Sequence, residues 1–597
     1  MRARNLGAAG IALALAWSGA ACAVIPTQGS PVPVGAAVQG DPLRKPYVRV
    51  IAMPPRPEWR PEQVVTGFLA AMASVDDPRW SVARQYLTPD AGHLWRPEAG
   101  VTVYEGQLPD AITVTPDAKE ITVPLKGTVI GTIDTTGKYH ATSAPDGQPL
   151  DQPFKLVKGP QGWRITEFPD GLLLNADDIR RSYRAVKLYY LDNQQKGLVV
   201  DEVRIRVDPS TDFAESIVNR LLDGATTGLK DAVHNAVPAG TTLHRVSTDD
   251  DKIIVDLNEA ATNAISTGPG GGSVAAMAAQ IGWTLDQLTE RWDIEIRVNG
   301  EPFYPDGGTL EVGYNTYRAF DPWLVPGKTP AYYLKGGTLQ MLHEDDEHVA
   351  AVPVPASTDR LGDDYDDFAL SGLGPYKLAA LHKDHKVISV APLVQGAQWQ
   401  QTIAGTSLLR PCWDRYDNLW TVDKLGEHSS RVLRYDGKQV VQVSAPSLEG
   451  VDVRELRVAR DGVRVAAVVD GEHGTQVLVG TVVVKGSEVR ISNFQPFVTA
   501  GDGEIKDIAW RDATTLLVLT GGRAGQEVRA VSVTDGTSES FKADARITSI
   551  TALGDSILAG AEDAADGKRE VLRWEAAKSA WVAAAKDDAT YPLLPLG

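Results

Sequence analysis

The most constraining feature of this 597-residue chain is a repeat that occupies about its last 250 residues. Each unit consists of two apolar stretches on either side of a turn that contains an aspartate. Five units can be read in the sequence: Leu378–Val390 around Asp384, Leu408–Val422 around Asp417, Leu456–Val468 around Asp461, Ile508–Leu519 around Asp512, and Ile550–Ala559 around Asp555. The aspartates lie roughly 33 to 51 residues apart, which brackets the length of one β-propeller blade. Residues 341–597 therefore predict an all-β, propeller-like domain with room for six units, and a two-sheet sandwich is the alternative.

The chemically notable side chains of this repeat are predicted to be structural. Aspartate favours turns because its carboxylate bonds the local backbone, so the repeat position already explains these acids. Trp413, Trp420 and Trp510 fall in apolar strands and are expected in the core rather than on a sugar-binding surface. Cys412 lies in the same kind of apolar run, which predicts a buried thiol.

The first residues have the pattern of a bacterial lipoprotein signal. Arg2 and Arg4 form a basic head, Leu6–Trp17 is uncharged and mostly apolar, and Gly19–Ala21 leads into Cys22. This pattern predicts cleavage after Ala21 and conversion of Cys22 to an N-palmitoyl, S-diacylglycerol cysteine. The protein would then be anchored in the cell membrane by lipid, with the chain on the extracytoplasmic side. The alternative is that residues 6–25 remain as one short transmembrane helix.

Composition narrows the classes of partner. The formal net charge of -18 disfavours a nucleic-acid partner and predicts that the protein as a whole does not bind an anionic membrane face by charge, so that the lipid must hold it there. The chain has two cysteines, so lipidation of Cys22 would leave Cys412 alone and allow no disulfide framework. A chain of this length should hold several domains. After the signal peptide at 1–21, residues 22–55 are expected to form a lipidated tether.

Two domains are predicted between the tether and the repeat. Residues 56–180 begin with two helical patterns, one with Val64, Val65, Phe68, Leu69 and Met72 on one face and one over Trp80–Leu87. Strands are expected at Val101–Tyr104, Ala111–Val114, Ile121–Ile133, Phe154–Val157 and Trp163–Phe168. Helices followed by strands favour an α+β domain, and the order resembles the cone of nuclear transport factor 2. Such a cone can hold a pocket, but a scaffold is the prediction here.

Residues 184–304 change to alternating strands and helices, which predicts an α/β layer architecture. Strands are expected at Val186–Leu191, Leu198–Val207, Leu243–Val246, Ile253–Leu257 and Ile294–Val298, with helices at Asp212–Leu222 and Ser273–Leu288. The Asn299-Gly300 pair predicts a hairpin turn. The segments VKLYYLD at 186–192, LLDG at 221–224, AVPAGTTLHRV at 236–246 and IIVDLN at 253–258 resemble the GerMN domain of exported proteins. Residues 305–340 are expected to link this domain to the repeat.

The sequence shows no set of residues that predicts catalysis, a metal ion or a cofactor. Gly268–Ser273 opens a helix but lacks the lysine and spacing of a nucleotide-binding loop. The acidic clusters Asp249–Asp251, Asp363–Asp367 and His343–His348 lack the spacing of calcium or zinc sites, so solvated loops are expected. No Gly-x-Ser-x-Gly elbow is present. The protein is therefore expected not to be an enzyme.

The order of modules resembles the LpqB family, lipoproteins of high-GC Gram-positive bacteria. Within the repeat, LLRPCWDRYDNLWTVD at 408–423 and LRVARDGVRVAAVV at 456–469 carry the resemblance. The resemblance implies an accessory binder that modulates a sensor histidine kinase of the MtrB type through its extracellular domain, with effects on two-component signalling and cell-envelope homeostasis. Two alternatives remain: a module that binds cell-wall glycan, and an envelope hydrolase or lactonase.

Overall fold

The fold is described from a computed structural model of the chain. It describes residues 51–142, 147–249, 252–265, 274–288, 293–303, 311–312, 320–322, 329–342, 352–353, 361–372, 374–394, 397–471, 474–501, 503–523, 525–542, 545–562 and 567–596. The predicted signal, Ala21, Cys22 and most of the predicted tether lie outside these residues. No helix within the described ranges is both long and apolar enough to cross a bilayer.

The N-terminal unit packs helices against one six-stranded sheet, as an α+β domain should. The helices are α1 (Pro61–Ala73), α2 (Ser81–Arg84), α3 (Pro89–Leu94) and α4 (Ala176–Ser182). The strands are β1 (Val101–Gln107), β2 (Glu120–Ile133), β3 (Tyr139–Ala141), β4 (Gln148–Gly159), β5 (Gly162–Ile165) and β6 (Leu172–Asn175), in the order β5-β4-β2-β1-β6 with β3 beside β2. Pro61 occupies the first helical position of α1, where its missing N–H is not needed. The apolar face of α1 meets the sheet, and the rings of Phe68 and Phe168 lie edge to face 5.0 Å apart.

One predicted strand of this unit is wrong. Ala111–Val114 is irregular, with exposed or half-buried side chains. Pro109 and Pro116 flank the segment, and each lacks a backbone N–H for a strand ladder. The alternation of apolar and polar residues there does not lead to a buried face.

The middle unit has the predicted alternation of strands and helices. Its elements are β7 (Tyr183–Asp192), β8 (Leu198–Arg206), α5 (Phe213–Leu222), β9 (Val233–His234), β10 (Leu243–Asp249), β11 (Lys252–Leu257), α6 (Val274–Leu285), β12 (Asp293–Val298), β13 (Glu301–Pro302) and β14 (Glu311–Val312). Strands β11 and β12 are parallel, which requires the crossover that α6 supplies. At the predicted turn, Asn299 and Gly300 have φ of 53° and 85°, the left-handed values of a two-residue hairpin.

The C-terminal unit is a propeller of six four-stranded sheets within the described residues, which excludes the sandwich. The sheets, in chain order, are β15 (Ala331–Lys335), β16 (Thr338–Leu342) and β17 (Val352–Pro353) with β38 (Ala589–Leu593); β18 (Tyr365–Leu370), β19 (Lys377–His382), β20 (Val387–Pro392) and β21 (Gln400–Ala404); β22 (Cys412–Trp413), β23 (Leu419–Gly426), β24 (Ser429–Tyr435) and β25 (Val440–Val443); β26 (Val453–Val458), β27 (Arg464–Gly471), β28 (Gly474–Lys485) and β29 (Glu488–Thr499); β30 (Glu504–Trp510), β31 (Thr515–Gly522), β32 (Gly525–Ser532) and β33 (Ser538–Phe541); and β34 (Arg546–Leu553), β35 (Ser556–Glu562), β36 (Arg569–Glu575) and β37 (Ala580–Ala585).

The first sheet closes the ring by pairing the two ends of the domain. Strand β38 near the C-terminus pairs antiparallel with β15, so Leu334 faces Thr590. As a result β15 and most of β16 fall within residues 305–340, where the sequence predicts a linker. The first sheet escapes local pattern analysis because its strands come from opposite ends of the unit.

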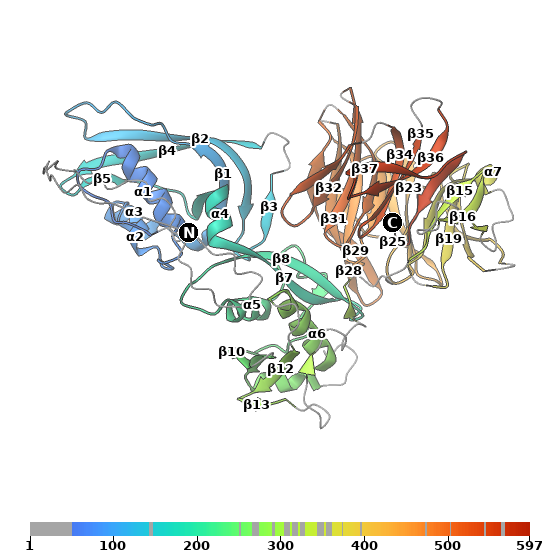
Figure 1. Cartoon of the computed structure of the whole chain (residues 1–597), viewed down its shortest axis with the longest axis horizontal. Coiled ribbons are helices and arrows are strands. Elements are labelled where there is room, and N and C mark those ends of the chain that lie inside the picture. The colour runs from blue at the N-terminus through green and yellow to red at the C-terminus, as the bar shows by residue number, and fades with distance from the viewer. Residues whose placement is uncertain are drawn as a thin grey trace, which may run out of the picture.

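The three units form one assembly in which the β7–β8 hairpin of the middle unit runs between the other two units, while the rest of the middle unit lies below them in this view (Figure 1). Helix α4 leads directly into β7, and the long β7–β8 hairpin runs from the N-terminal unit towards the propeller (Figure 1). The turn after β2 and strand β3 also approach the propeller. These connections place side chains of all three units around β8.

Candidate functional site

The three units meet around Arg204 of β8. Its backbone N–H donates to the carbonyl of Gly137 in the N-terminal unit at 2.7 Å. Its guanidinium lies over the ring of Tyr139, 5.7 Å from the centroid, and its Nη2 donates to Asp535 in the propeller at 3.1 Å. The Arg204 and Asp535 side chains are only 17% and 21% exposed, so this ion pair is largely shielded from water. One arginine therefore joins all three units.

A second arginine reinforces the contact between the first two units. Arg220 on α5 donates from Nε and Nη2 to the carbonyl of Thr136, at 3.0 and 2.7 Å. The turn that presents Thr136 is held by Asp134, which accepts hydrogen bonds from the Thr136 and Lys138 backbones. Although burial acts to raise it, bonds from His140, Thr136 and Lys138 lower the pKa of Asp134 to about 2. The turn is therefore built around an ionised carboxylate.

The β7–β8 hairpin docks onto the propeller. Arg464 of β27 donates to the carbonyl of Val200 at 2.5 Å and pairs with Asp461 through its other nitrogen. Apolar side chains of both units pack beside this contact: Val199, Leu229 and Ala232 from the middle unit, and Val463 and Val483 from the propeller. At the tip, a Cβ on Gly197 would lie 2.3 Å from Nη2 of Arg415, so glycine allows the close approach. The hairpin is thus a buried part of the interface.

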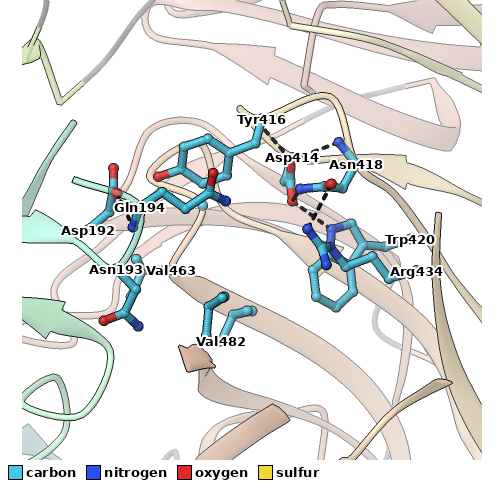
Figure 2. A pocket seen from close by; sticks show the side chains of 12 residues that line it. Asp192, Asn193, Gln194, Asp414, Tyr416, Asn418, Trp420, Arg434, Val463 and Val482 are labelled. Atoms are coloured by element: carbon cyan, nitrogen blue, oxygen red, sulfur yellow. Dashed lines mark hydrogen bonds between the residues drawn. The ribbon is translucent and has the colours of Figure 1, made fainter. Parts of the chain in front are cut away.

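A narrow gap remains at the hairpin tip, and it is too small for a substrate. Figure 2 shows the hydroxyl of Tyr416 facing the carboxylate of Asp192, with Gln194 beside them. The free volume is about 10 Å³, which corresponds to about one water molecule. Burial, together with the Asp192 carboxylate, raises the pKa of Tyr416 well above its ordinary value. The tyrosine therefore stays protonated and can donate a hydrogen bond within the gap.

Three of the five predicted aspartates, Asp384, Asp461 and Asp512, have the predicted structural role, whereas Asp555 is fully exposed and pairs with Arg511. Asp461 accepts from the Val463 and Arg464 backbones, and Asp512 accepts from Thr514 and Thr515. In the third sheet the accepting residue is Asp414 and not the predicted Asp417, because Asp414 bonds the Tyr416 and Asn418 backbones. Asp414 and Asp417 lie in the same DRYDN segment at 414–418, and either position suits a turn, so the sequence pattern did not show which of the two accepts the backbone bonds.

The predicted core residues of the propeller are buried. Trp413, Trp420 and Trp510 are at most 3% exposed, and their indole nitrogens donate to Ala369 O, Asp414 Oδ2 and Arg457 O. Cys412 is buried, and burial raises the pKa of its thiol to about 11. A thiol with that pKa is not a nucleophile near neutral pH.

Charged side chains that were not predicted cluster along the innermost strands of the propeller. Arg410 Nη1 lies 3.2 Å from Asp507, and its Nε lies 3.8 Å from Asp367. Arg457 Nη2 lies 2.7 Å from Glu455 on the same strand. These residues come from the second to the fifth sheets, so the cluster links four sheets at the centre of the ring.

The cluster contains a buried acid whose pKa is raised. Burial is the largest influence on Glu455 and raises the pKa of its carboxyl to about 8, while Arg457 opposes this and Asp507 adds to it. Just after β26, Arg460 donates to the carbonyls of Ala552 and Pro595 at 2.5 and 2.6 Å. Burial lowers the pKa of Arg460 to about 9. Buried charged side chains thus join neighbouring sheets, through ion pairs in the cluster and through main-chain carbonyls at Arg460.

Most of the other candidate residues suggested by the sequence lie outside the described residues. His343–His348, Asp250–Asp251 and Gly268–Ser273 lie outside the described residues, as do Cys22 and Ala21. Asp363 and Asp364 line an open groove with His382. Within the described ranges, no three His, Cys, Asp or Glu side chains are arranged to hold a metal ion.

Comparison with known proteins accounts for nearly the whole chain. The family described as "Lipoprotein LpqB, N-terminal domain" matches residues 54–180, "Sporulation and spore germination" matches 187–304, and "Lipoprotein LpqB beta-propeller domain" matches 340–595. Among solved structures, the first GerMN domain of the sporulation protein GerM from Bacillus subtilis is 19% identical, covering 22% of this chain and 94% of that chain, with a TM-score of 0.18.

Relatives match over similar lengths. Lipoprotein LpqB of Thermobifida fusca is 31% identical over 96% of this chain and 98% of that relative. Lipoprotein LpqB of Streptomyces coelicolor is 28% identical over 89% of each. The similarity spans all three units in the order that the structure shows, and the chain therefore belongs to the LpqB lipoprotein family.

Proposed function

We propose that this protein is a lipid-anchored accessory protein on the outer face of the cytoplasmic membrane, where it binds the extracytoplasmic domain of a sensor histidine kinase and modulates its signalling. The kinase, of the MtrB type, is the partner that the likeness to the LpqB family implies. The protein acts through binding and not through catalysis.

The observation that carries this proposal is the joint around Arg204. A partner that contacts two units gains affinity when those units are already held in fixed positions, because less conformational freedom is lost on binding. The ion pair to Asp535 and the bonds from Arg220 to Thr136 supply that fixed arrangement. Binding one small substrate within a single unit would not require this fixed arrangement of three units.

The centre of the propeller also favours binding at an outer surface. Arg410, Glu455, Arg457 and Asp507 contact one another there, and Arg460 bridges Ala552 and Pro595. The gap at the hairpin tip holds about one water molecule. The faces of the propeller are then the surfaces through which it meets a protein partner.

Anchoring through Cys22 makes a modest affinity sufficient. Two proteins confined to the same membrane meet at a high effective concentration, so contacts that are weak in solution can be occupied in the cell. Two or more acyl chains on one cysteine give stable attachment, since each buried methylene contributes about 0.8 kcal/mol.

In-cell photo-cross-linking tests this function. A photoreactive amino acid at exposed positions of the propeller, such as Lys438, is expected to trap the kinase. The matched control carries the same residue at Asp117 in the N-terminal unit. Cross-links to many unrelated envelope proteins, or none to the kinase from any propeller position, would contradict the proposal.

A further inference from the structure

The described chain begins with an exposed segment that contains apolar residues. Ile51 and Met53 are 71% and 47% exposed, and they are among the few large apolar side chains on the described surface. The segment is fixed to the N-terminal unit, because the hydroxyl of Tyr86 donates to the carbonyl of Met53. Its apolar side chains are therefore held outward on an ordered surface.

The same segment borders an open groove. The groove has a volume of about 420 Å³ and is lined by Pro57, Glu58, Trp59, Arg60, Pro61, Ile112, Val114, Lys158 and Trp163. Lys158 is exposed, and its ammonium lies 5.8 Å from the centre of the Trp163 ring. Arg60 is about half exposed, pairs with the buried Glu62 at 2.8 Å and donates to the carbonyl of Ile112. The surface combines proline and cationic side chains with the half-buried Trp59, while Trp163 beneath Lys158 is only 4% exposed.

The charge of this region is opposite to that of the whole protein. Residues 41–62 contain five basic residues, Arg44, Lys45, Arg49, Arg56 and Arg60, and three acidic residues, Asp41, Glu58 and Glu62, the last of which pairs with Arg60 at 2.8 Å. The complete chain has a formal charge of -18. Basic charge is thus concentrated where the described chain begins, on the side from which the lipid-bearing residue would be reached.

We propose that this surface, Ile51–Arg60 together with Lys158, binds the face of an anionic phospholipid bilayer. Cationic side chains near a charged bilayer each contribute about 1 kcal/mol, and the effect decays within a Debye length. The exposed Ile51 and Met53, with the half-buried Trp59, fit the interfacial layer, where an apolar body meets a polar edge. The remaining acidic surface would be repelled, which orients the N-terminal unit towards the membrane.

This inference rests on the proposed function in one respect: the lipid anchor places the chain near a bilayer. Residues 23–50 span at most about 100 Å when fully extended, so Cys22 and the surface can reach the same membrane. The lipid holds the protein at the membrane, and the basic surface sets which side faces it.

Vesicle binding by the chain from residue 23 to 597 tests the surface without the lipid. We expect this chain to sediment with vesicles that contain phosphatidylglycerol and not with purely phosphatidylcholine vesicles, and to dissociate as salt increases. The variant Arg56→Glu/Lys158→Glu should lose binding by about 10-fold or more. The control Lys438→Glu/Lys485→Glu, which makes the same charge change on exposed propeller residues, should bind as well as the parent.

A second variant, Ile51→Ser/Met53→Ser, should also bind more weakly and leave the melting temperature unchanged, because both side chains are exposed. Equal binding to neutral and anionic vesicles, equal losses in the test and control charge variants, or no vesicle binding would overturn the proposal. The proposal would also be overturned if the chain bound insoluble cell wall and not vesicles, and if Arg56→Glu/Lys158→Glu abolished that binding to the wall. None of these results bears on the lipidation of Cys22, which this chain lacks.

Discussion

Arg204 of β8 donates to Asp535 of the propeller at 3.1 Å while its own backbone bonds the N-terminal unit at Gly137. A single residue of the middle unit is therefore the point at which the positions of the other two are coupled. Because both side chains are mostly shielded, removing either one leaves a charge with fewer partners in a poorly solvated place.

Arg204→Ala is expected to destabilise the protein by about 1–3 kcal/mol, and Asp535→Asn by less, because the amide can still accept from Thr537. A double-mutant cycle followed by urea unfolding should give a coupling energy of at least about 0.5 kcal/mol. The matched control is the ion pair Arg546–Glu562, which has a similar N–O distance of 2.8 Å but an arginine that is 69% exposed. For this pair we expect a coupling energy of about 0–0.5 kcal/mol. Equal coupling for both pairs would remove the special role of Arg204.

Substitution at the hairpin tip should loosen the middle unit from the propeller. Gly197→Leu must displace Arg415, which donates to the carbonyls of Asp321 and Pro322. Gly197→Ala is expected to cost less, because the displaced atoms are the end of a flexible side chain. Faster cleavage of the hairpin in limited proteolysis measures the effect. Gly228→Leu, where an added Cβ meets nothing within 4 Å, should leave the cleavage rate unchanged.

The charged cluster of the propeller should make stability depend on pH. The folded state raises the pKa of Glu455 from an ordinary 4.5 to about 8, so between these values the folded protein binds more protons than the unfolded chain. The contribution of this group is therefore fully present below about pH 4.5 and is lost as the pH rises towards 8. Arg410, Arg457, Asp367, Asp507, Tyr591 and Cys412 are the other titratable groups around it.

Glu455→Gln mimics the neutral acid and should remove this dependence. Urea midpoints measured at pH 5, 6.5 and 8 are expected to fall less with pH in the variant than in the parent chain. The variant should be at least as stable as the parent at pH 8, since glutamine has no proton to lose. A parent and variant with parallel pH profiles would show that Glu455 titrates normally.

Trp420→Phe is expected to cost about 1–3 kcal/mol beyond its small volume change, because a buried carboxylate of Asp414 loses one of its donors. Trp510→Phe is the comparison, since its indole donates to a neutral carbonyl, that of Arg457. The two variants differ mainly in the charge of the acceptor. If chemical denaturation gave the same loss for both, the carboxylate would carry no special cost.

Cys22→Ala is expected to yield a protein that no longer partitions into detergent, because no thiol remains to carry lipid. Mass spectrometry of the parent's mature N-terminus should find Cys22 as the first residue with its acyl groups attached. Unchanged partitioning of the variant would show instead that residues 6–25 remain as a membrane helix.

Local patterns in the sequence predicted the elements that local interactions determine. The apolar spacing of Val64, Phe68 and Met72 gave α1, and Asn299-Gly300 gave a hairpin turn, because each depends on residues close in the chain. The aspartate turns of the propeller were predictable for the same reason. The choice between Asp414 and Asp417 was not, since both positions suit a turn.

Long-range contacts were not accessible in the same way. The pairing of β15 with β38 joins residues about 250 positions apart, and no spacing rule connects them. The joint at Arg204 and the cluster around Glu455 also depend on which units meet. A weak signal was present in VRELRV at 453–458, where charges interrupt an apolar strand, and a single strand does not show what those charges face.

We expect this protein to bind the extracytoplasmic domain of a sensor histidine kinase. Isothermal titration calorimetry of the chain from residue 23 to 597 against the purified kinase domain from the same bacterium tests it directly. We expect saturable binding, weakened by Arg204→Ala if the fixed arrangement of units matters. If the titration showed no heat of binding at concentrations up to about 100 µM, the proposed binding to the kinase would be wrong.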